Sequence, residues 1–171
     1  MSNLLVTGGA GFIGTNYVRA RSVAHPDAPI IVLDAMTYSA KAANLDGLTN
    51  VTLTEGDIRD EGLVTRLLRD HDIDTLVHFA AESHVDRSIS GPDIFIDTNI
   101  IGTHSLLKVA RAVWLDGSSG QPHRFHHIST DEVFGSLGAD DAAFHEDTPY
   151  APNSPYSASK EIGRASCRER V

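Results

Sequence analysis

The sequence has a single cysteine, no excess of basic residues and no long apolar run, and each of these absences excludes a class of protein. With only Cys167 among 171 residues, a disulfide framework and a thiolate zinc site are both excluded. Lys and Arg number 14 against 23 Asp and Glu, so the net charge is −9 and the chain offers no basic face for nucleic acid. No apolar run approaches the roughly 20 residues of a membrane span, and residues 1–6 lack the basic start of a secretory signal. These features predict a cytoplasmic protein without nucleic-acid or membrane partners.

Short apolar runs alternate with longer helical patterns, which is typical of parallel βαβ units. The chain shows no repeat and no interdomain linker, and its loops are too short to separate domains. We therefore predict an α/β fold with one doubly wound parallel sheet of the Rossmann type, truncated at the C-terminus. The expected strands are 4–6, 30–34, 51–53, 75–79 and 125–129, and the expected helices are 12–24, 60–70 and 99–114.

A glycine-rich segment, Thr7–Gly14, joins the first expected strand to the first expected helix. There a dinucleotide pyrophosphate would meet free backbone N–H groups and the positive end of the helix dipole. Asp34 follows Gly14 by twenty residues, at the end of the second strand, where its carboxylate can accept both adenosine ribose hydroxyls and repel a 2′-phosphate. The glycines alone could mark a tight turn. With a strand before them, a helix after them and Asp34 at this distance, they predict NAD as the cofactor, in preference to NADP.

Two further strand ends are expected to border the same crevice, because ligands of open α/β sheets bind beyond the carboxyl ends of strands. Asp57 and Ile58 can hold the adenine, and the segment Phe79–Ser83 offers small residues beside the nicotinamide ribose. Asp57 could instead cap the next helix, and Ala80 and Ala81 could serve close packing alone.

Residues suited to acid–base chemistry follow the fifth strand. Thr130, Asp131 and Glu132 supply a hydroxyl and two carboxyl groups, and a Tyr-x-x-x-Lys pair follows at Tyr156 and Lys160. Around one nucleotide cofactor, these residues could catalyse oxidation coupled to elimination. Elimination needs a protonated acid and an ionised base at the same pH. The alternatives are a solvated loop for the two acids and one exposed helix face for the Tyr–Lys pair.

The final segment, 161–171, does not fit the sequence before it. It has no helical apolar stripe, and it can be back-translated into a nucleotide sequence that resembles a common sequencing adapter. We interpret residues 161–171 as a non-native tail and residues 1–160 as an incomplete NAD-binding Rossmann domain. A divergent helix end is the alternative.

Four segments carry a family resemblance: Thr7–Gly14, Ala80–Ser88, Ser129–Val133 and Pro155–Lys160. Together they closely resemble the dTDP-glucose 4,6-dehydratase family of the extended short-chain dehydrogenase/reductase superfamily, over residues 3–160. The glycines identify only the superfamily. The acid pair after Thr130 and the segment before Ser88 narrow the resemblance to the dehydratases.

The resemblance implies a three-step conversion of dTDP-glucose to dTDP-4-dehydro-6-deoxyglucose, with NAD regenerated in each turnover. Tyr156, acidified by Lys160 and the nicotinamide charge, would take the proton of the 4-hydroxyl while hydride passes to NAD. Glu132 would then act as base at carbon 5 and Asp131 as acid towards the 6-hydroxyl, before hydride returns to carbon 6. Thr130 and Ser83 would contact the sugar.

The resemblance also implies a homodimer, packed through the helix 99–114 and the helix that carries Lys160. It places Asn99 where an Asn organises the backbone near the active site, with a helix cap as the alternative. The expected cofactor contacts, from residues and resemblance together, are Gly8, Gly11, Phe12, Ile13, Gly14, Asp34, Ala35, Met36, Thr37, Asp57, Ile58, Phe79, Ala80, Ala81, Ser83, Thr98, Tyr156 and Lys160.

Two other functions and the question of a metal site remain to be weighed. A related NAD-dependent sugar-nucleotide epimerase or decarboxylase would use Tyr156 and Lys160 but would need no acid pair. A truncated dinucleotide-binding module without turnover is the other possibility. No metal site is expected, because His123, His126 and His127 have no Cys, Asp or Glu nearby to complete a ligand set.

Overall fold

The computed structural model describes residues 3–116 and 122–168, and the chain forms two compact units. The first comprises Met1–Ala80 with Ser105–Ile128 and is called here the sheet unit. The second comprises Ala81–His104 with Ser129–Val171 and is called the helical unit.

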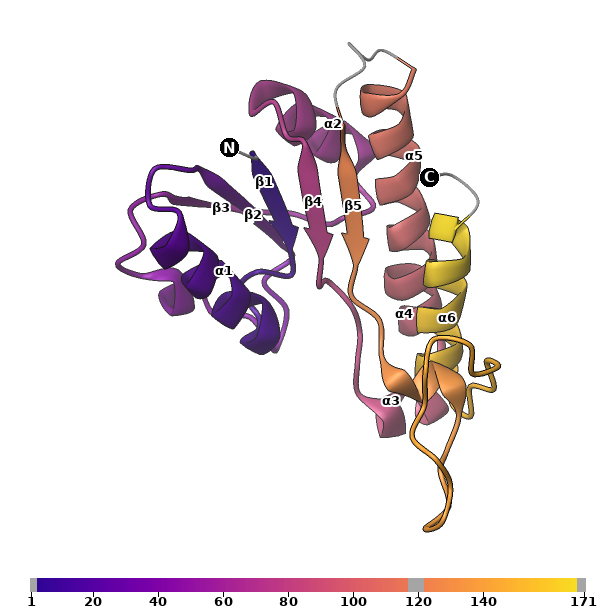
Figure 1. Ribbon diagram of the computed structural model, residues 1–171. Coiled ribbons are helices and arrows are strands. Elements are labelled where there is room, and N and C mark those ends of the chain that lie inside the picture. Colours follow the sequence, from indigo (N-terminus) through magenta and orange to yellow (C-terminus); the bar gives the residue numbers. More distant parts are fainter. Residues whose placement is uncertain (1–2, 117–121, 169–171) are drawn as a thin grey trace. The chain divides into compact units, whose positions relative to one another are not determined.

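Five parallel strands form the single sheet of the sheet unit, in the order β3-β2-β1-β4-β5 (Figure 1). The strand order reverses at β1: β2 and β3 lie on one side of it, β4 and β5 on the other. This arrangement confirms the predicted doubly wound parallel sheet. The strands are β1 (Leu4–Thr7), β2 (Ile30–Asp34), β3 (Val51–Glu55), β4 (Thr75–His78) and β5 (Arg124–His127).

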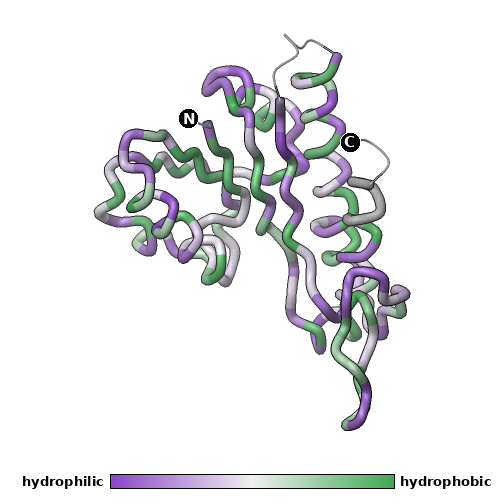
Figure 2. The backbone as a smooth tube through the Cα atoms, in the orientation of Figure 1, coloured by the Kyte–Doolittle hydropathy of each residue, from purple (hydrophilic) through white to green (hydrophobic). Residues whose placement is uncertain are grey.

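The central strands β1, β2 and β4 are buried on both faces, which is why they are continuous apolar runs in the sequence; Figure 2 shows these runs in green. Successive side chains of a strand point to opposite faces, so Leu5 and Leu4 belong to different cores. Leu5 lies in the core formed with α2 (Glu61–Asp70) and α5 (Thr103–Trp114), and Leu4 in the core formed with α1 (Phe12–Ala24).

Local signals in the sequence explain where two helices begin. Asp60 caps α2, since its Oδ1 accepts the backbone N–H of Leu63 at 2.9 Å. In the helical unit, α6 (Pro155–Arg168) starts with Pro155 in its first turn, where a missing N–H costs nothing. Ser154 and Ser157 bond reciprocally across that start: each backbone N–H donates to the other residue's hydroxyl at 3.1 Å.

The helical unit contains a feature that a 3.6-residue period does not reveal. The one long helix expected over 99–114 is instead a π-helix, η2 (Ile96–Gly102), followed by α5. The expectation was wrong at its start, because apolar spacing reports which face is buried and not which backbone hydrogen bonds form. The unit's other elements are α3 (Val85–Ser90), α4 (Asp93–Phe95), the 3₁₀ helix η3 (Asp131–Phe134) and α6.

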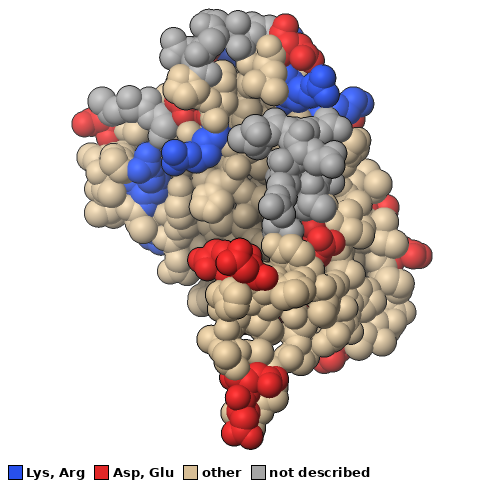
Figure 3. All heavy atoms as spheres, turned by 45° about the vertical axis from the view of Figure 1, so that its right-hand side comes forward, with Lys and Arg blue, Asp and Glu red and all other residues tan. Residues whose placement is uncertain are grey.

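The loop between η3 and α6 is built around an aromatic group. The ring of Phe134 stacks on Tyr150 at 5.1 Å and lies 5.3 Å from Phe144. Acidic side chains gather at the projecting tip of this loop, which carries Asp140 and Asp141 (Figure 3). Part of the chain's negative charge is therefore concentrated in the helical unit.

The helix α6 continues to Arg168, past Lys160, where the sequence showed no helical pattern. Residues 161–168 are therefore helical although their segment has no helical apolar stripe. A backbone helix does not identify the origin of its residues, so the non-native tail 161–171 stays a proposal, and residues 169–171 lie outside the described residues. Among the residues that the structure describes, no helix is both long and apolar enough to span a membrane.

Candidate cofactor and active sites

The glycine-rich turn after β1 approaches its neighbours too closely for any side chain. Gly8 has a φ of +72°, and a Cβ on it would lie 2.5 Å from the backbone nitrogen of Ala80. A Cβ on Gly14 would collide with the carbonyl oxygen of Gly8. The turn is thus shaped by backbone alone, as close approach to a pyrophosphate requires. Beside it, Phe12 and Ile13 open α1 with their side chains 82% and 66% exposed.

Asp34 is buried at the end of β2, and both of its carboxylate oxygens accept backbone N–H groups. Oδ2 accepts from Ala10 at 2.9 Å and Oδ1 from Met36 at 3.0 Å. Each oxygen retains a lone pair for a ribose hydroxyl. Met36 takes the uncommon φ of +52°, which turns the segment 35–37 at this strand end.

Sequence reasoning missed the residues that hold the glycine turn in place from the other side. The carbonyl oxygen of Ala10 accepts the backbone N–H of Lys41 at 3.2 Å and the side-chain amide of Asn44 at 3.1 Å. Both belong to the segment around η1 (Ala42–Leu45), which was expected to be plain loop. The sequence signal for this contact was the amide side chain of Asn44 within that loop.

Asp57 is tied to Arg59 and does not cap a helix. Its Oδ2 lies 2.7 Å from the Arg59 guanidinium, and its Oδ1 accepts the Arg59 backbone N–H at 2.8 Å. The hydrogen bonds from Arg59 hold the pKa of Asp57 below its usual range. The capping alternative for Asp57 is therefore wrong, since Asp60 caps α2. Ile58 packs in the core with α2 and α5, and its expected place beside the adenine stays a prediction.

The ends of β1 and β4 are joined beneath the glycine turn. Thr7 and His78 form a buried 2.7 Å hydrogen bond between Oγ1 and Nδ1, and Phe79 donates its N–H to Thr7 at 2.9 Å. The Ala80 backbone is the surface that Gly8 meets, which fits the close-packing role weighed for it. Thr7 and His78 were not among the expected site residues.

The helical unit brings the expected acid–base residues together. Thr130 precedes η3: its hydroxyl accepts the N–H of Glu132 at 3.3 Å and lies 3.4 Å from Oδ1 of Asp131. Both acids are exposed. Thr130 is also hydrogen-bonded to Tyr156, and Lys160 lies one turn further along α6, only 4% exposed.

The groups around Tyr156 raise the pKa of its phenol. Burial raises the pKa of the Tyr156 phenol, the negative charges of Glu132 and Asp131 raise it further, and the Thr130 hydrogen bond acts in the opposite direction. The expected acidification of the phenol by Lys160 and the nicotinamide charge stays a prediction. Burial and neighbouring carboxylates both favour the neutral phenol.

Asn99 lies within η2 and organises the backbone at Glu82. Its side-chain oxygen accepts the Glu82 N–H, and its amide nitrogen donates to the Glu82 carbonyl, both at 2.9 Å. The helix-cap alternative for Asn99 is not observed. Ser83, which follows Glu82, is exposed, and Thr98, which precedes Asn99, is half-buried.

The expected site residues thus fall into two groups, one in each unit. The sheet unit holds the glycine turn, Asp34–Thr37, Asp57, Ile58, Phe79 and Ala80. The helical unit holds Ala81, Ser83, Thr98, Thr130, Asp131, Glu132, Tyr156 and Lys160.

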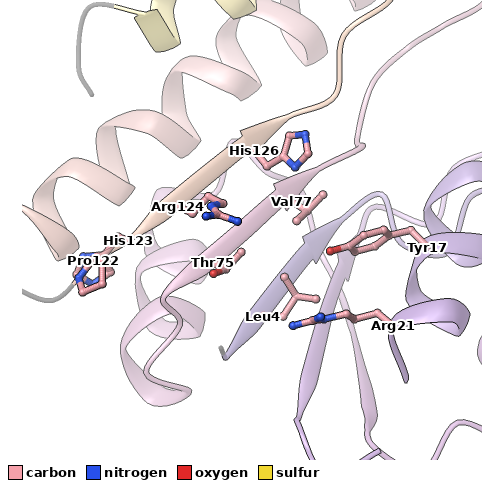
Figure 4. Close-up of a pocket in the computed structure, with 9 residues that line it drawn as sticks. All are labelled: Leu4, Tyr17, Arg21, Thr75, Val77, Pro122, His123, Arg124 and His126. Atoms are coloured by element: carbon pink, nitrogen blue, oxygen red, sulfur yellow. The ribbon is translucent and has the colours of Figure 1, made fainter. Parts of the chain in front are cut away.

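A separate pocket of about 360 Å³ lies in the sheet unit (Figure 4). Leu4, Thr75 and Arg124, which line it, are the first residues of β1, β4 and β5, so it sits at the amino ends of the strands. Cofactors of open α/β sheets bind at the opposite, carboxyl ends, so this pocket is not the candidate cofactor site. His123 and His126 also line it, and the described residues include no cluster of three or more potential metal ligands.

Comparison with known proteins shows the family of the chain. The family model described as GDP-mannose 4,6 dehydratase matches residues 5–169. The chain belongs to that family. A dTDP-glucose 4,6-dehydratase of Xanthomonas campestris pv. campestris (strain B100) is 50% identical over 165 residues, which are 94% of this chain and 46% of the relative. The match to the family model also continues past Lys160 into the proposed tail.

Two solved structures have a similar fold to this chain. The dTDP-glucose 4,6-dehydratase of Streptomyces venezuelae, crystallised with NAD, has a TM-score of 0.85 and 47% identity, covering 98% of this chain and 51% of that one. A UDP-Glc/GlcNAc 4-epimerase of Campylobacter jejuni has the same TM-score at 27% identity, covering 99% of this chain and 49% of that one. The chain spans about half the length of the curated relatives it matches. The family resemblance carried by the four segments is confirmed.

Proposed function

We propose that this chain is the amino-terminal part of an NAD-dependent dTDP-glucose 4,6-dehydratase that acts in the cytoplasm. The observation that carries the proposal is the exposed pair Asp131–Glu132, in one unit with Thr130 and Tyr156. An oxidation alone needs the phenol and a cofactor, whereas loss of water needs an additional acid and base.

The residues of the sheet unit fit the cofactor. The side-chain-free turn at Gly8 and Gly14 leaves room for a pyrophosphate, and Asp34 retains acceptor capacity for ribose hydroxyls. The segment 35–37 has no Arg or Lys to hold a 2′-phosphate, which supports NAD over NADP. When bound, NAD would take hydride from carbon 4 of the sugar and return it to carbon 6.

The residues of the helical unit divide the proton transfers. Tyr156 takes the proton of the 4-hydroxyl, and Thr130 hydrogen-bonds the oxygen at carbon 4. Glu132 then removes the proton at carbon 5, which the neighbouring ketone has acidified, and Asp131 protonates the departing 6-hydroxyl. Ser83 lies exposed in the same unit as a contact for the sugar.

Tyr156 must be deprotonated for the first step, against the effect of its own surroundings. Burial, Glu132 and Asp131 all raise its pKa. Positive charge near the phenol offsets these effects, and we assign that role to the Lys160 ammonium and to the cationic nicotinamide ring.

A sugar-nucleotide epimerase is the second candidate, because an epimerase shares the fold at 27% identity. Epimerisation also uses a phenol and NAD, but it breaks no carbon–oxygen bond. It therefore needs no pair of carboxyl groups as acid and base. The acid pair and the 50% identity to a dehydratase favour dehydration.

We further propose that the complete protein is a homodimer. Apolar side chains are partly exposed on α4 and η2 of the helical unit, which supports an interface there: Ile94, Ile96 and Ile101, each 43–47% exposed. This extends the expected interface to helices beyond α5 and α6.

Isotope transfer tests the function. The full-length protein, supplied with dTDP-glucose deuterated at carbon 4, is expected to yield product with deuterium at carbon 6 and no net NADH. NADH that accumulates in proportion to product would exclude the proposed mechanism.

A further inference from the structure

Ser159 lies between the two catalytic residues of α6 and is almost completely buried, at 2% exposure. Its hydroxyl donates to the backbone carbonyl of Tyr156 at 2.7 Å. The same oxygen accepts a hydrogen bond from the side-chain amide of Asn99 at 2.8 Å. Ser159 therefore connects α6 to the π-helix η2 within the helical unit.

The direction of these hydrogen bonds is determined by the groups themselves. The amide nitrogen of Asn99 can only donate, and its two hydrogens go to the Glu82 carbonyl and to Ser159. The single hydroxyl proton of Ser159 is then donated to the backbone carbonyl of Tyr156. The chain of donors runs from the Glu82 N–H through Asn99 and Ser159 to the Tyr156 carbonyl, and hydrogen bonds aligned in one direction strengthen one another.

The carbonyl at the end of this chain has a special position. In an α-helix, the carbonyl of Tyr156 is the acceptor for the backbone N–H of Lys160. The Ser159 hydroxyl thus binds the backbone group that fixes Lys160 one turn after Tyr156. On its other side, the Tyr156 ring lies edge-on to the buried Phe95 at 6.4 Å.

The π-helix supports this arrangement from Asn99. Its wider turn is rare and is often found at functional sites. The Asn99 carbonyl accepts the hydroxyl of Thr103 at 2.6 Å. Asn99 is therefore held through its backbone as well as its side chain, and it gives Ser159 a rigid partner.

We propose that Ser159 is a positioning residue, which transmits the rigid Glu82–Asn99 contact to α6 and so holds Tyr156 and Lys160 in reacting geometry. This inference rests on the proposed function, in which Tyr156 is the base of the first step. Ser157 offers a matched comparison, because it is equally buried on the same helix but its hydroxyl bonds with Ser154 and not with Asn99.

The test compares three variants of the full-length protein. Ser159→Ala is expected to lower kcat roughly tenfold or more, with KM within about twofold, because small misplacements of reacting groups are costly. Ser159→Thr should restore most of kcat, since a helical Thr hydroxyl can also bond a carbonyl one turn back. Ser157→Ala should lower the melting temperature while kcat stays near the wild-type value.

A second readout does not depend on turnover. Titration of the Tyr156 ring carbon by NMR, assigned with Tyr156→Phe, should show a lower phenol pKa in Ser159→Ala, because a loosened α6 lets water reach the ring. Ser157→Ala should titrate like the wild type. If wild-type protein shows no dehydratase activity, the proposed function fails while this titration still tests the positioning role.

The proposal has clear contrary outcomes. Wild-type kcat and an unshifted Tyr156 titration in Ser159→Ala would show that Ser159 only packs. Should that variant fail to fold, Ser159→Cys replaces the hydroxyl with a weak donor of similar shape. Reduced kcat in the Cys variant supports the proposal, and wild-type kcat overturns it.

Discussion

Two glycines with nearly the same backbone conformation have very different surroundings. Gly8 and Gly47 have φ values of +72° and +80°. A Cβ on Gly8 meets the backbone of Ala80, whereas one on Gly47 has nothing within 4 Å. Substituting each glycine by Ala therefore distinguishes the effect of an unusual φ, which both variants share, from the effect of a side chain in the glycine turn, which only Gly8→Ala adds.

We predict that Gly8→Ala abolishes NAD binding in the full-length protein, while Gly47→Ala preserves it. Both variants carry the left-handed backbone penalty of about 1–2 kcal/mol. Only Gly8→Ala also forces backbone apart at the point where β1 meets β4. Calorimetric NAD titration of both variants checks this, and equal affinities would remove the glycine turn from the binding site.

The acid pair allows oxidation to be separated from elimination. Asp131→Asn is expected to slow loss of water far more than formation of the 4-ketone, because an amide cannot deliver the proton; a loss on the order of 100-fold is typical for a general acid. Glu132→Gln should behave likewise. Single-turnover measurement of NADH appearance and of water loss distinguishes the steps. Wild-type turnover in both variants would make the pair structural and would favour the epimerase alternative.

At the scale of elements, the turn between β3 and α2 depends on pH through one carboxylate. Arg59 keeps the pKa of Asp57 below the ordinary 3.8. A lowered folded-state pKa stabilises the fold above the unfolded value and loses that contribution as the pH falls through the folded one. Both side chains are about 40% exposed, so the contribution is small.

Arg59→Gln should therefore lower stability slightly at pH 6 and leave it unchanged near pH 2. Urea unfolding of the variant and the wild type at both pH values measures the difference. A matched control is Arg66→Gln, which alters another Arg of the same region without touching Asp57. A difference that persists at pH 2 would mean that Arg59 acts by packing and not through the Asp57 charge.

The elements show how far sequence reasoning reaches. All five strands were located to within a few residues, because buried parallel strands are short apolar runs between turn signals. The glycine turn and Asp34 came from spacing alone. The Asn44 contact and the Thr7–His78 bond were not predicted, because each is a hydrogen bond between segments that only the fold brings together. The π-helix was not predicted because apolar spacing does not report which backbone hydrogen bonds form.

For the whole molecule, the 171-residue chain contains the glycine turn and Asp34 of the proposed cofactor site but spans only about half the length of its relatives. The sheet unit has two buried cores and a formed glycine turn, so it has the means to fold and to hold NAD weakly. The residues proposed to contact the sugar lie in the helical unit. The nucleotide of the substrate has no recognised contact among the described residues, and the relatives are about twice as long.

We expect the isolated chain to bind NAD at most weakly, to show no dehydratase activity and to aggregate. Its exposed isoleucines on α4 and η2 are the surface that the proposed dimer would cover. Bringing reacting groups into place requires the whole substrate site, since loss of positioning alone can remove several orders of magnitude in rate. Purified chain is assayed with dTDP-glucose and NAD beside the full-length protein, and its molar mass is followed by light scattering. Substantial turnover by the chain would show that the second half is dispensable, and would place the substrate site within the residues described.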